Sequence, residues 1–267
     1  MRLTHCLRIS LTGLAIAIPA IVPSAALAEI AVGAARVVVA DVSAETALAS
    51  RKLAVSDDVR YRELIATARD SATVIQFVDQ TELAIGEQAR VRLDDFVFDP
   101  GTAGKLDLTL EFGALRFSTG TMAKSAYRIA TPTASLAVRG TEFDLAVDDD
   151  GATYLLVRHG AVTITARNGA SKQVGVGQFV TVDVAGVPTE PRIAAAAPAG
   201  ALPAKIDAMD TALAGAVASA GDAADLGDLS VLAKARALRS GTRPEAGKSG
   251  KLGKADKDKK SGGPGPL

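Results

Sequence analysis

The chain has little of what most enzymes use for catalysis or metal binding. Its 267 residues include one cysteine, two histidines and no tryptophan. Because the one cysteine, Cys6, lies at the N-terminus, the body of the protein has neither a disulfide nor a cysteine–histidine catalytic pair. The two histidines, His5 and His159, are too few for a multi-histidine metal site and disfavour a serine–histidine triad. Glycine-rich phosphate loops, zinc-protease helices and dinucleotide fingerprints are also absent.

The chain also lacks an excess of charge. Thirty lysine and arginine residues balance 30 aspartate and glutamate residues, so the formal net charge is +0. Domains that bind nucleic acid usually carry a marked positive excess. The composition therefore does not suggest a nucleic-acid partner.

The N-terminus has the layout of a secretory signal peptide. Arg2 and Arg8 precede an apolar stretch over residues 11–18, and a small-residue cleavage signal occupies residues 26–28. The alternative is an uncleaved membrane anchor, but the apolar stretch is short for a span. We therefore predict cleavage after Ala28, no integral membrane span in the mature chain, and a periplasmic, secreted or cell-surface location.

The region after the signal peptide has the pattern of an all-β domain. Short runs of alternating apolar residues are separated by turn residues such as Asp99-Pro100-Gly101 and Asn168-Gly169. We expect a β domain over residues 29–185, a twisted solenoid-like roll or sandwich of many short strands. The stretch Val42–Leu53 is alanine-rich, and we interpret it as a loop or insertion between early strands.

The C-terminal third has a different composition. Proline and alanine over residues 186–202 indicate a linker, and alanine and leucine over residues 203–240 indicate a weakly helical segment. Within it, Ile206, Met209, Leu213 and Val217 form a narrow apolar stripe. Glycine, lysine and proline dominate residues 241–267, where we expect a disordered tail. That tail is either a solubilising appendage or a weak electrostatic attachment to an anionic envelope surface.

The run Thr131–Phe143 lies at the centre of the predicted domain. Ala134, Leu136 and Val138 alternate with polar or small residues, as in a half-buried strand. Gly140 interrupts the alternation, which predicts a bulge or a close backbone approach, and a β-branched residue there should damage folding.

Arg139 stands next to this glycine, between two apolar stretches. A buried arginine needs a carboxylate or several carbonyl groups, because an unpaired buried charge is very costly. Glu142 and Asp144 are the nearest acids in the sequence. We favour a structural ion pair or carbonyl clamp that locks the strand junction over a ligand-binding arginine.

Carboxylates remain as candidates for chemistry. Pairs of them can act as acid and base, and the candidates are Asp94-Asp95 and Glu142/Asp144. Asp148–Asp150 could ligate calcium, although such acidic turns are more often solvated. We expect neither a bound metal nor a cofactor.

An ordered set of fragments resembles the FecR domain family. The central run is similar to the family pattern T-P-x-A-x-x-x-V-R-G-T-x-F, and its structural motif residues here are Thr131, Pro132, Arg139, Gly140, Thr141 and Phe143. Other matching fragments lie in order along residues 55–182; they are Asp70–Phe77, Thr81–Gly86, Phe96–Pro100, Phe112–Phe117, Gly160–Val162 and Gly177-Gln178.

The resemblance implies an extracytoplasmic all-β domain that, in the best-known members, passes a signal inward from an outer-membrane receptor. Those members carry a cytoplasmic sigma-factor-binding segment and a membrane helix before the domain. Here the predicted domain follows the signal peptide almost directly, which puts direct control of transcription in doubt. No catalytic residues are implied.

We therefore expect a standalone exported, non-catalytic protein that acts by contact, with an envelope protein or a cell-surface glycan as its partner. One alternative is a component of a transcriptional signalling pathway that works through a separate membrane anti-sigma protein. A less favoured alternative is a carboxylate-dependent glycan-active enzyme, which needs two acids facing one cleft.

Overall fold

The computed structural model describes residues 30–98, 104–194 and 201–219. The signal peptide (1–28), the part of the expected helical segment after residue 219 and the tail (241–267) lie outside these ranges, so those predictions stay predictions. The elements are β1 Ala31–Val39, β2 Val42–Glu45, β3 Ser50–Lys52, β4 Asp58–Arg60, β5 Leu64–Thr67, β6 Ala72–Phe77, β7 Glu82–Ile85, β8 Arg90–Val97, β9 Lys105–Ser118, β10 Tyr127–Ala130, β11 Ala134–Val147, β12 Thr153–Ala166, β13 Ser171–Gly175, β14 Gln178–Val182, β15 Arg192–Ile193 and α1 Ala201–Ser219.

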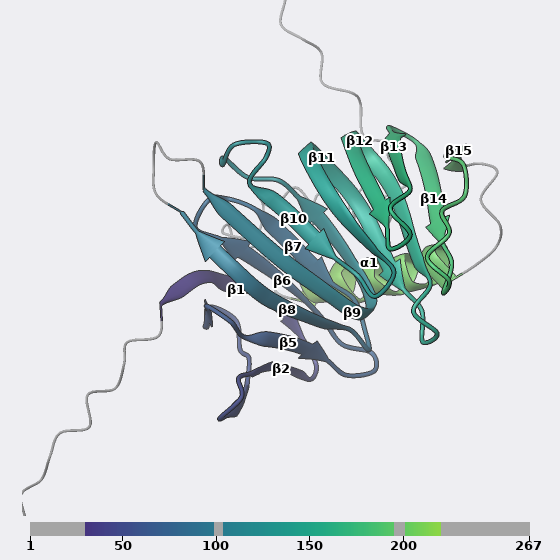
Figure 1. Cartoon of the computed structure of the whole chain (residues 1–267). Coiled ribbons are helices and arrows are strands. Elements are labelled where there is room, and N and C mark those ends of the chain that lie inside the picture. The colour runs from purple at the N-terminus through teal and green to yellow at the C-terminus, as the bar shows by residue number, and fades with distance from the viewer. Residues whose placement is uncertain (1–29, 99–103, 195–200, 220–267) are drawn as a thin grey trace, which may run out of the picture.

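All these strands join one sheet, which folds over into two layers with an apolar core between them (Figure 1). One layer, here called the helix layer, contains β4, β1, β6, β7, the second half of β9, the second half of β11, the first half of β12, β14 and β15. The opposite layer contains β2, β3, β5, β8, β10, β13 and the other halves of the three long strands. Phe77 on β6 and Phe96 on β8 stack across the core at 5.6 Å between ring centroids. The predicted all-β roll is confirmed.

Three 14-residue strands, β9, β11 and β12, run through both layers. Each bends at a glycine with positive φ, namely Gly113 (+93°), Gly140 (+62°) and Gly160 (+77°). The register between β11 and β12 shifts between Arg139 and Glu142, which is the bulge that the sequence predicts at Gly140. Across the bends, β11 and β12 stay paired with each other, while β9 exchanges β8 and β10 for β7 and β11 as its neighbours.

Two parts of the sequence interpretation differ from the structure. The stretch Val42–Leu53 is not a loop, because β2 and β3 form a hairpin in it and β2 also pairs with β5. The alanine content of this stretch did not indicate a strand, because alanine has a weak strand preference. In the structure Ala44 is an inward-facing residue of β2 and is buried in the core. The first half of the expected linker is also paired with the sheet, through the bridge Val182–Pro188 and through β15.

The helix α1 lies against the outer face of the helix layer (Figure 1). Ile206, Met209 and Leu213, three members of the predicted stripe, are buried there. They contact a second apolar cluster built largely from small side chains of the sheet; its other members are Val37, Ala72, Val74, Ala84, Ala114 and Ala146. None of the side chains described in α1 belongs to the main core, so the roll has its own core without the helix.

A buried carboxylate organises the turn after β6. Asp79 is fully buried and accepts hydrogen bonds from the Thr81 hydroxyl at 2.6 Å and from the Tyr127 hydroxyl at 2.9 Å. The Met122 amide donates to the same Tyr127 oxygen at 3.1 Å. Burial, with the negative charge of Asp79 close by, raises the pKa of Tyr127 to about 12.

The bend glycines allow a matched test. An added Cβ at Gly160 would lie 2.5 Å from the Gly140 carbonyl oxygen and 2.6 Å from Thr141 Cγ2, whereas at Gly169 (φ +86°) it would meet nothing within 4 Å. Gly169→Ala should lose about 1–2 kcal/mol of unfolding free energy, for its dihedral angle alone. Gly160→Ala should lose about 3 kcal/mol or more, because overpacking adds to the same dihedral cost.

Urea unfolding of both variants measures the difference. Gly140→Val should also lose stability. The nearest atom to an added Cβ at Gly140 is Lys124 Cε at 3.4 Å, so there is room for the Cβ and the cost comes from the positive φ. Equal stability of the Gly160 and Gly169 variants would contradict the close approach at the bend.

Tyr127 should make stability depend on pH under alkaline conditions. Its folded pKa lies above the usual value near 10, so the folded state holds the proton more tightly than the unfolded chain. That contribution is fully present below pH ~10 and is lost as the pH rises to about 12, by about 2–3 kcal/mol. Tyr127→Phe should cost about 1–2 kcal/mol at neutral pH and show a shallower decline across this window in pH-dependent urea melts.

Candidate interaction site

The most unusual chemistry of the described residues is a buried arginine between the sheet and α1. Arg116 lies on β9 with its side chain on the outer face of the helix layer, and α1 leaves it 1% exposed. Its Nε donates to Asp144 Oδ1 at 2.7 Å, directly across the strand pair β9–β11. Its two terminal nitrogens donate to the two carboxylate oxygens of Asp210 on α1, at 2.7 and 3.1 Å. One guanidinium therefore joins two strands and the helix.

A second arginine completes the network. Asp144 is fully buried, and its Oδ2 also accepts from Arg158 Nε at 2.5 Å. Arg158 lies on β12, the strand next to β11, so the carboxylate stands between two cations. With Asp210, the four side chains hold two positive and two negative charges. At the edge of the network, Lys205 on α1 lies 3.8 Å from Asp148.

Electrostatics make this network strongly interdependent. Burial alone would lower the pKa of Arg116, but the two carboxylates outweigh it and raise that pKa further above its usual value. Removing one partner would leave a charge with poor access to water, which costs far more than an exposed ion pair contributes. The network can fix a helix in place, and it presents no reactive group.

The surface under α1 is here called the docking face; it consists of Ala72, Val74, Ala84, Gly86, Ala114, Arg116, Asp144 and Ala146. Small side chains let the helix approach the sheet closely. An added Cβ at Gly86 would lie 3.3 Å from Met209 Cβ. The docking face is thus a largely apolar surface that carries the ion pair of Arg116 and Asp144.

The structure corrects the role expected of Arg139. Its side chain is exposed on the opposite layer, because it alternates with the inward Val138. The buried ion pair expected of it is formed by Arg116, and Asp144, one of its expected partners, belongs to that pair. Arg139 is therefore not the structural lock.

Three other motif residues pack in the core or make hydrogen bonds that hold the fold. Phe143 is buried in the core, with its ring 5.5 Å from that of Phe117. The Thr131 hydroxyl accepts from the Ala134 amide at 3.0 Å and from the Thr153 hydroxyl at 2.8 Å. The Pro132 carbonyl accepts a hydrogen bond from Arg167. Pro132 thus helps to hold the entrance of β11.

Thr141 belongs to the bend itself. Its methyl group occupies the space where Gly160 would carry a Cβ, and the residue is buried. Gly140 supplies the positive φ one residue earlier. The glycine–threonine pair of β11 and the glycine of β12 therefore form one packed corner.

Asp94 and Asp95, one of the acid pairs considered for catalysis, make structural contacts. Asp94 accepts from Arg92 at 2.7 Å and from Thr109 at 2.5 Å. Asp95 accepts from Lys105 at 2.6 Å and from Tyr61 at 3.1 Å, and the hydrogen bond from Lys105 lowers the pKa of Asp95. Lowered pKa values suit ion pairs and not general acids.

The acidic turn Asp148–Asp150 closes the hairpin between β11 and β12. Asp150 accepts from the Ala152 amide at 3.0 Å, and the Gly151 amide donates to the Asp148 carbonyl at 2.9 Å. Across residues 30–98, 104–194 and 201–219, no group of three or more potential ligand side chains is arranged to hold a metal ion.

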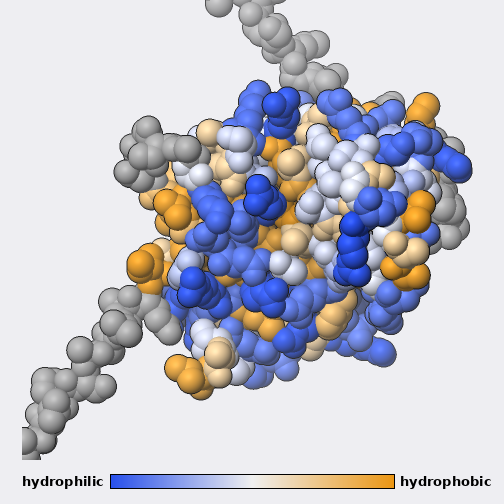
Figure 2. Space-filling model, viewed as in Figure 1, coloured by the Kyte–Doolittle hydropathy of each residue, from blue (hydrophilic) through white to orange (hydrophobic). Residues whose placement is uncertain are grey.

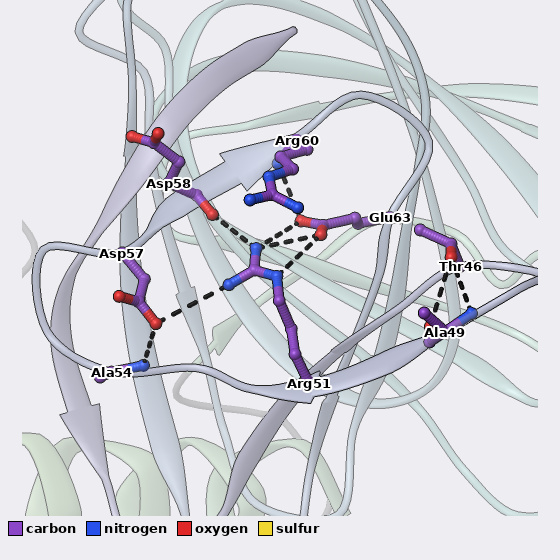
Figure 3. Close-up of polar contacts among 8 residues, drawn as sticks. All are labelled: Thr46, Ala49, Arg51, Ala54, Asp57, Asp58, Arg60 and Glu63. Atoms are coloured by element: carbon purple, nitrogen blue, oxygen red, sulfur yellow. Dashed lines mark hydrogen bonds and ion pairs between the residues drawn. The ribbon is translucent and has the colours of Figure 1, made fainter. Parts of the chain in front are cut away.

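A second polar cluster fixes the β2–β3 hairpin (Figure 3). Glu63 is buried and accepts three hydrogen bonds from Arg51, at 3.0–3.2 Å, and one from the Arg60 amide at 2.8 Å. Arg51 also donates to the Asp58 carbonyl at 2.6 Å. The hairpin is thereby tied to the loop that joins β4 and β5.

The tip of this hairpin presents an apolar side chain. Thr46 Oγ1 accepts from the amides of Leu48 and Ala49 at 3.4 and 3.2 Å, which closes a tight turn. Leu48 in that turn is 97% exposed. Figure 2 shows the face of the opposite layer, where hydrophilic side chains predominate and apolar groups appear both near the middle and at the margins.

Sequence reasoning missed Arg116 and Asp210, although both left a signal. Arg116 is the one charged residue in the alternating run Ala114–Phe117, and Asp210 directly follows Met209 of the apolar stripe. Each pattern implies a charge on a face that is otherwise apolar. Their pairing could not be found, because 94 positions separate them.

Part of the chain is similar to known proteins. Residues 63–163 match the model of the family described as FecR protein. Two crystal structures of a proposed anti-sigma factor from Parabacteroides distasonis are similar, with TM-scores of 0.40 and 0.41 and 16% and 15% identity. Each match covers 49% of this chain and 59% of the other, so the chain spans about three-fifths of those proteins. Comparison with curated proteins gives no match.

Arg116→Met tests the buried network. Without the guanidinium, Asp210 loses its cation while it stays buried between α1 and the sheet, so the variant should lose about 3–5 kcal/mol of unfolding free energy. Arg92→Met is the matched control, because Arg92 is 47% exposed on β8 and its ion pairs should contribute less than about 1 kcal/mol. Urea melts of both variants give the comparison, and similar losses would contradict a dominant role for the buried network.

Proposed function

Because this chain carries a FecR domain over residues 63–163, we propose that it is a non-catalytic interaction and signal-relay module of the bacterial envelope. The FecR domain is the observation that carries the proposal. The signal-peptide layout of the N-terminus supports an exported location, with the mature chain beginning at Glu29.

The chemistry of the described residues supports action by contact. Asp94, Asp95 and Asp144, three of the acids that could have served in a catalytic pair, are bound to arginine, lysine, threonine and tyrosine side chains. A carboxylate-dependent glycan hydrolase would need two acids free to face one substrate. Partners of a contact module are an envelope protein or a cell-surface glycan.

The β2–β3 hairpin offers a firm point of contact. Leu48 projects into solvent from a turn that its own hydrogen bonds close, on a hairpin that Arg51 and Glu63 tie to the body. A turn whose backbone is already held by hydrogen bonds loses little backbone entropy when a partner covers it. The hairpin tip therefore suits a shallow apolar recess on a partner protein.

Site-specific photo-crosslinking in cells tests this function. A photoreactive residue at Leu48 should capture a reproducible envelope protein, identified by mass spectrometry. The same residue at Val184, exposed in a turn after β14, serves as the control position. The mature N-terminus should be Glu29, by N-terminal sequencing. A cytoplasmic protein that retains its first 28 residues, or an absence of captured partners at any exposed position, would contradict the proposal.

A second candidate function is a part in transcriptional signalling through a separate membrane anti-sigma protein. The FecR domain favours it, because domains of this family are associated with signal transfer across the envelope. Deletion of the gene should then change the transcripts of a receptor or transport operon. An unchanged transcriptome under iron limitation and under envelope stress would leave only the contact function.

A further inference from the structure

We propose that the docking face is a binding site for an amphipathic helix of a partner protein, and that α1 is its resident occupant in the free protein. The partner helix would carry apolar side chains at i, i+3 and i+7 and a carboxylate at i+4, as Ile206, Met209, Leu213 and Asp210 do in α1. This inference rests on the proposed contact function and names the kind of partner.

The first argument is the change of chemistry along single strands. The outward side chains in the first half of β9 are polar, as at Asp107, Thr109 and Glu111, whereas in the second half they are Ala114 and Arg116. Ala72 and Ala84, on β6 and β7, continue this apolar surface. The outer face of one layer is thus built for water, and that of the other layer for a covering element.

The second argument is that this element should be a helix. The backbone groups of β6, β7, β9 and β11 already pair within the sheet, so a strand would find no hydrogen-bonding edge there. A helix satisfies its own backbone and needs only a stripe of apolar side chains. Gly86 adds room for a close approach, because a Cβ at this position would lie 3.3 Å from Met209 Cβ.

The third argument is charge. Without α1, Arg116 keeps its ion pair with Asp144 and loses both hydrogen bonds to Asp210. A guanidinium on an apolar surface is costly to leave without its second carboxylate. Arg116 holds both oxygens of Asp210, a geometry that selects a carboxylate over an amide or a hydroxyl. Any occupant must therefore bring an acid.

The fourth argument is that α1 can leave without opening the roll. Its buried side chains belong to the second cluster, and the main core between the two layers is complete without them. Asp207 and Thr211 on its other face are exposed. Gly215, with nothing within 4 Å of an added Cβ, weakens the helix near its end. Displacement would thus change one outer face and leave the fold standing.

A reversible tether tests the exchange. Gly86→Cys/Met209→Cys, in a Cys6→Ser background of the full chain, places two cysteines where the Cβ separation of 3.3 Å approaches that of a disulfide. The probe is a fluorescent synthetic peptide of residues 201–219. Reduced protein should bind it, and oxidised protein should bind it at least tenfold more weakly. Equal binding by both forms would overturn the site.

The acid is tested separately. A peptide with Asp210→Asn should bind the reduced protein at least tenfold more weakly than the unchanged peptide, whereas Asp207→Asn should bind as the unchanged peptide does. In the protein, Asp210→Asn should speed hydrogen–deuterium exchange of α1, and Asp207→Asn should not. Equal affinity of the three peptides would overturn the role of Arg116.

Two further outcomes separate this inference from the proposed function. Concentration-dependent dimers that disappear on oxidation would show that a second copy supplies the helix, which overturns a partner protein as the occupant. A partner captured from Leu48 equally by the oxidised and reduced tethered protein would leave the contact function intact and overturn its dependence on the docking face. Peptide exchange without any partner captured in cells would support the site and contradict the proposed function.

Discussion

The buried charge of Arg116 constrains the structure more than any other single group. It lies on an apolar face under a helix, so it needs carboxylates from both sides. Asp144 reaches it only if β9 and β11 keep their register, and Asp210 only if α1 sits in one position along the sheet. A slip of one residue in either strand would turn the partner side chain to the other face. One guanidinium thus specifies a strand pair and a helix position together.

This constraint depends on the bent strands. Asp144 follows the bend of β11 at Gly140, and Arg158 precedes the bend of β12 at Gly160. Only glycine reaches the required dihedral angles freely, and Gly160 must also admit the Gly140 carbonyl and the Thr141 methyl group. The corner therefore sets where each long strand enters the helix layer. The ion network then fixes what lies on that layer.

The sequence predicted the roll because alternation and turn residues are local signals. Gly140 was found for the same reason, since a glycine inside an alternating run marks a bulge. The arginine assignment failed because the sequence offered Arg139 beside two acids, while burial is decided by which face a layer covers. Arg116 and Asp210 meet only after two bends and a return of the chain. The β2–β3 hairpin was missed because alanine has a weak strand preference, which its pairing with β5 overrides.

The two outer faces of the roll divide its surface into different kinds of contact. Polar pairs such as Arg92 with Asp94 cover the opposite layer, and exposed pairs of this kind add little stability while they keep the face hydrated. The docking face instead combines small apolar side chains with a charge that must be compensated. A surface that requires a carboxylate on a helix is selective in a way that a polar face is not. Because α1 meets that requirement from outside the main core, the helix covers a selective binding face while the core between the two layers is complete without it.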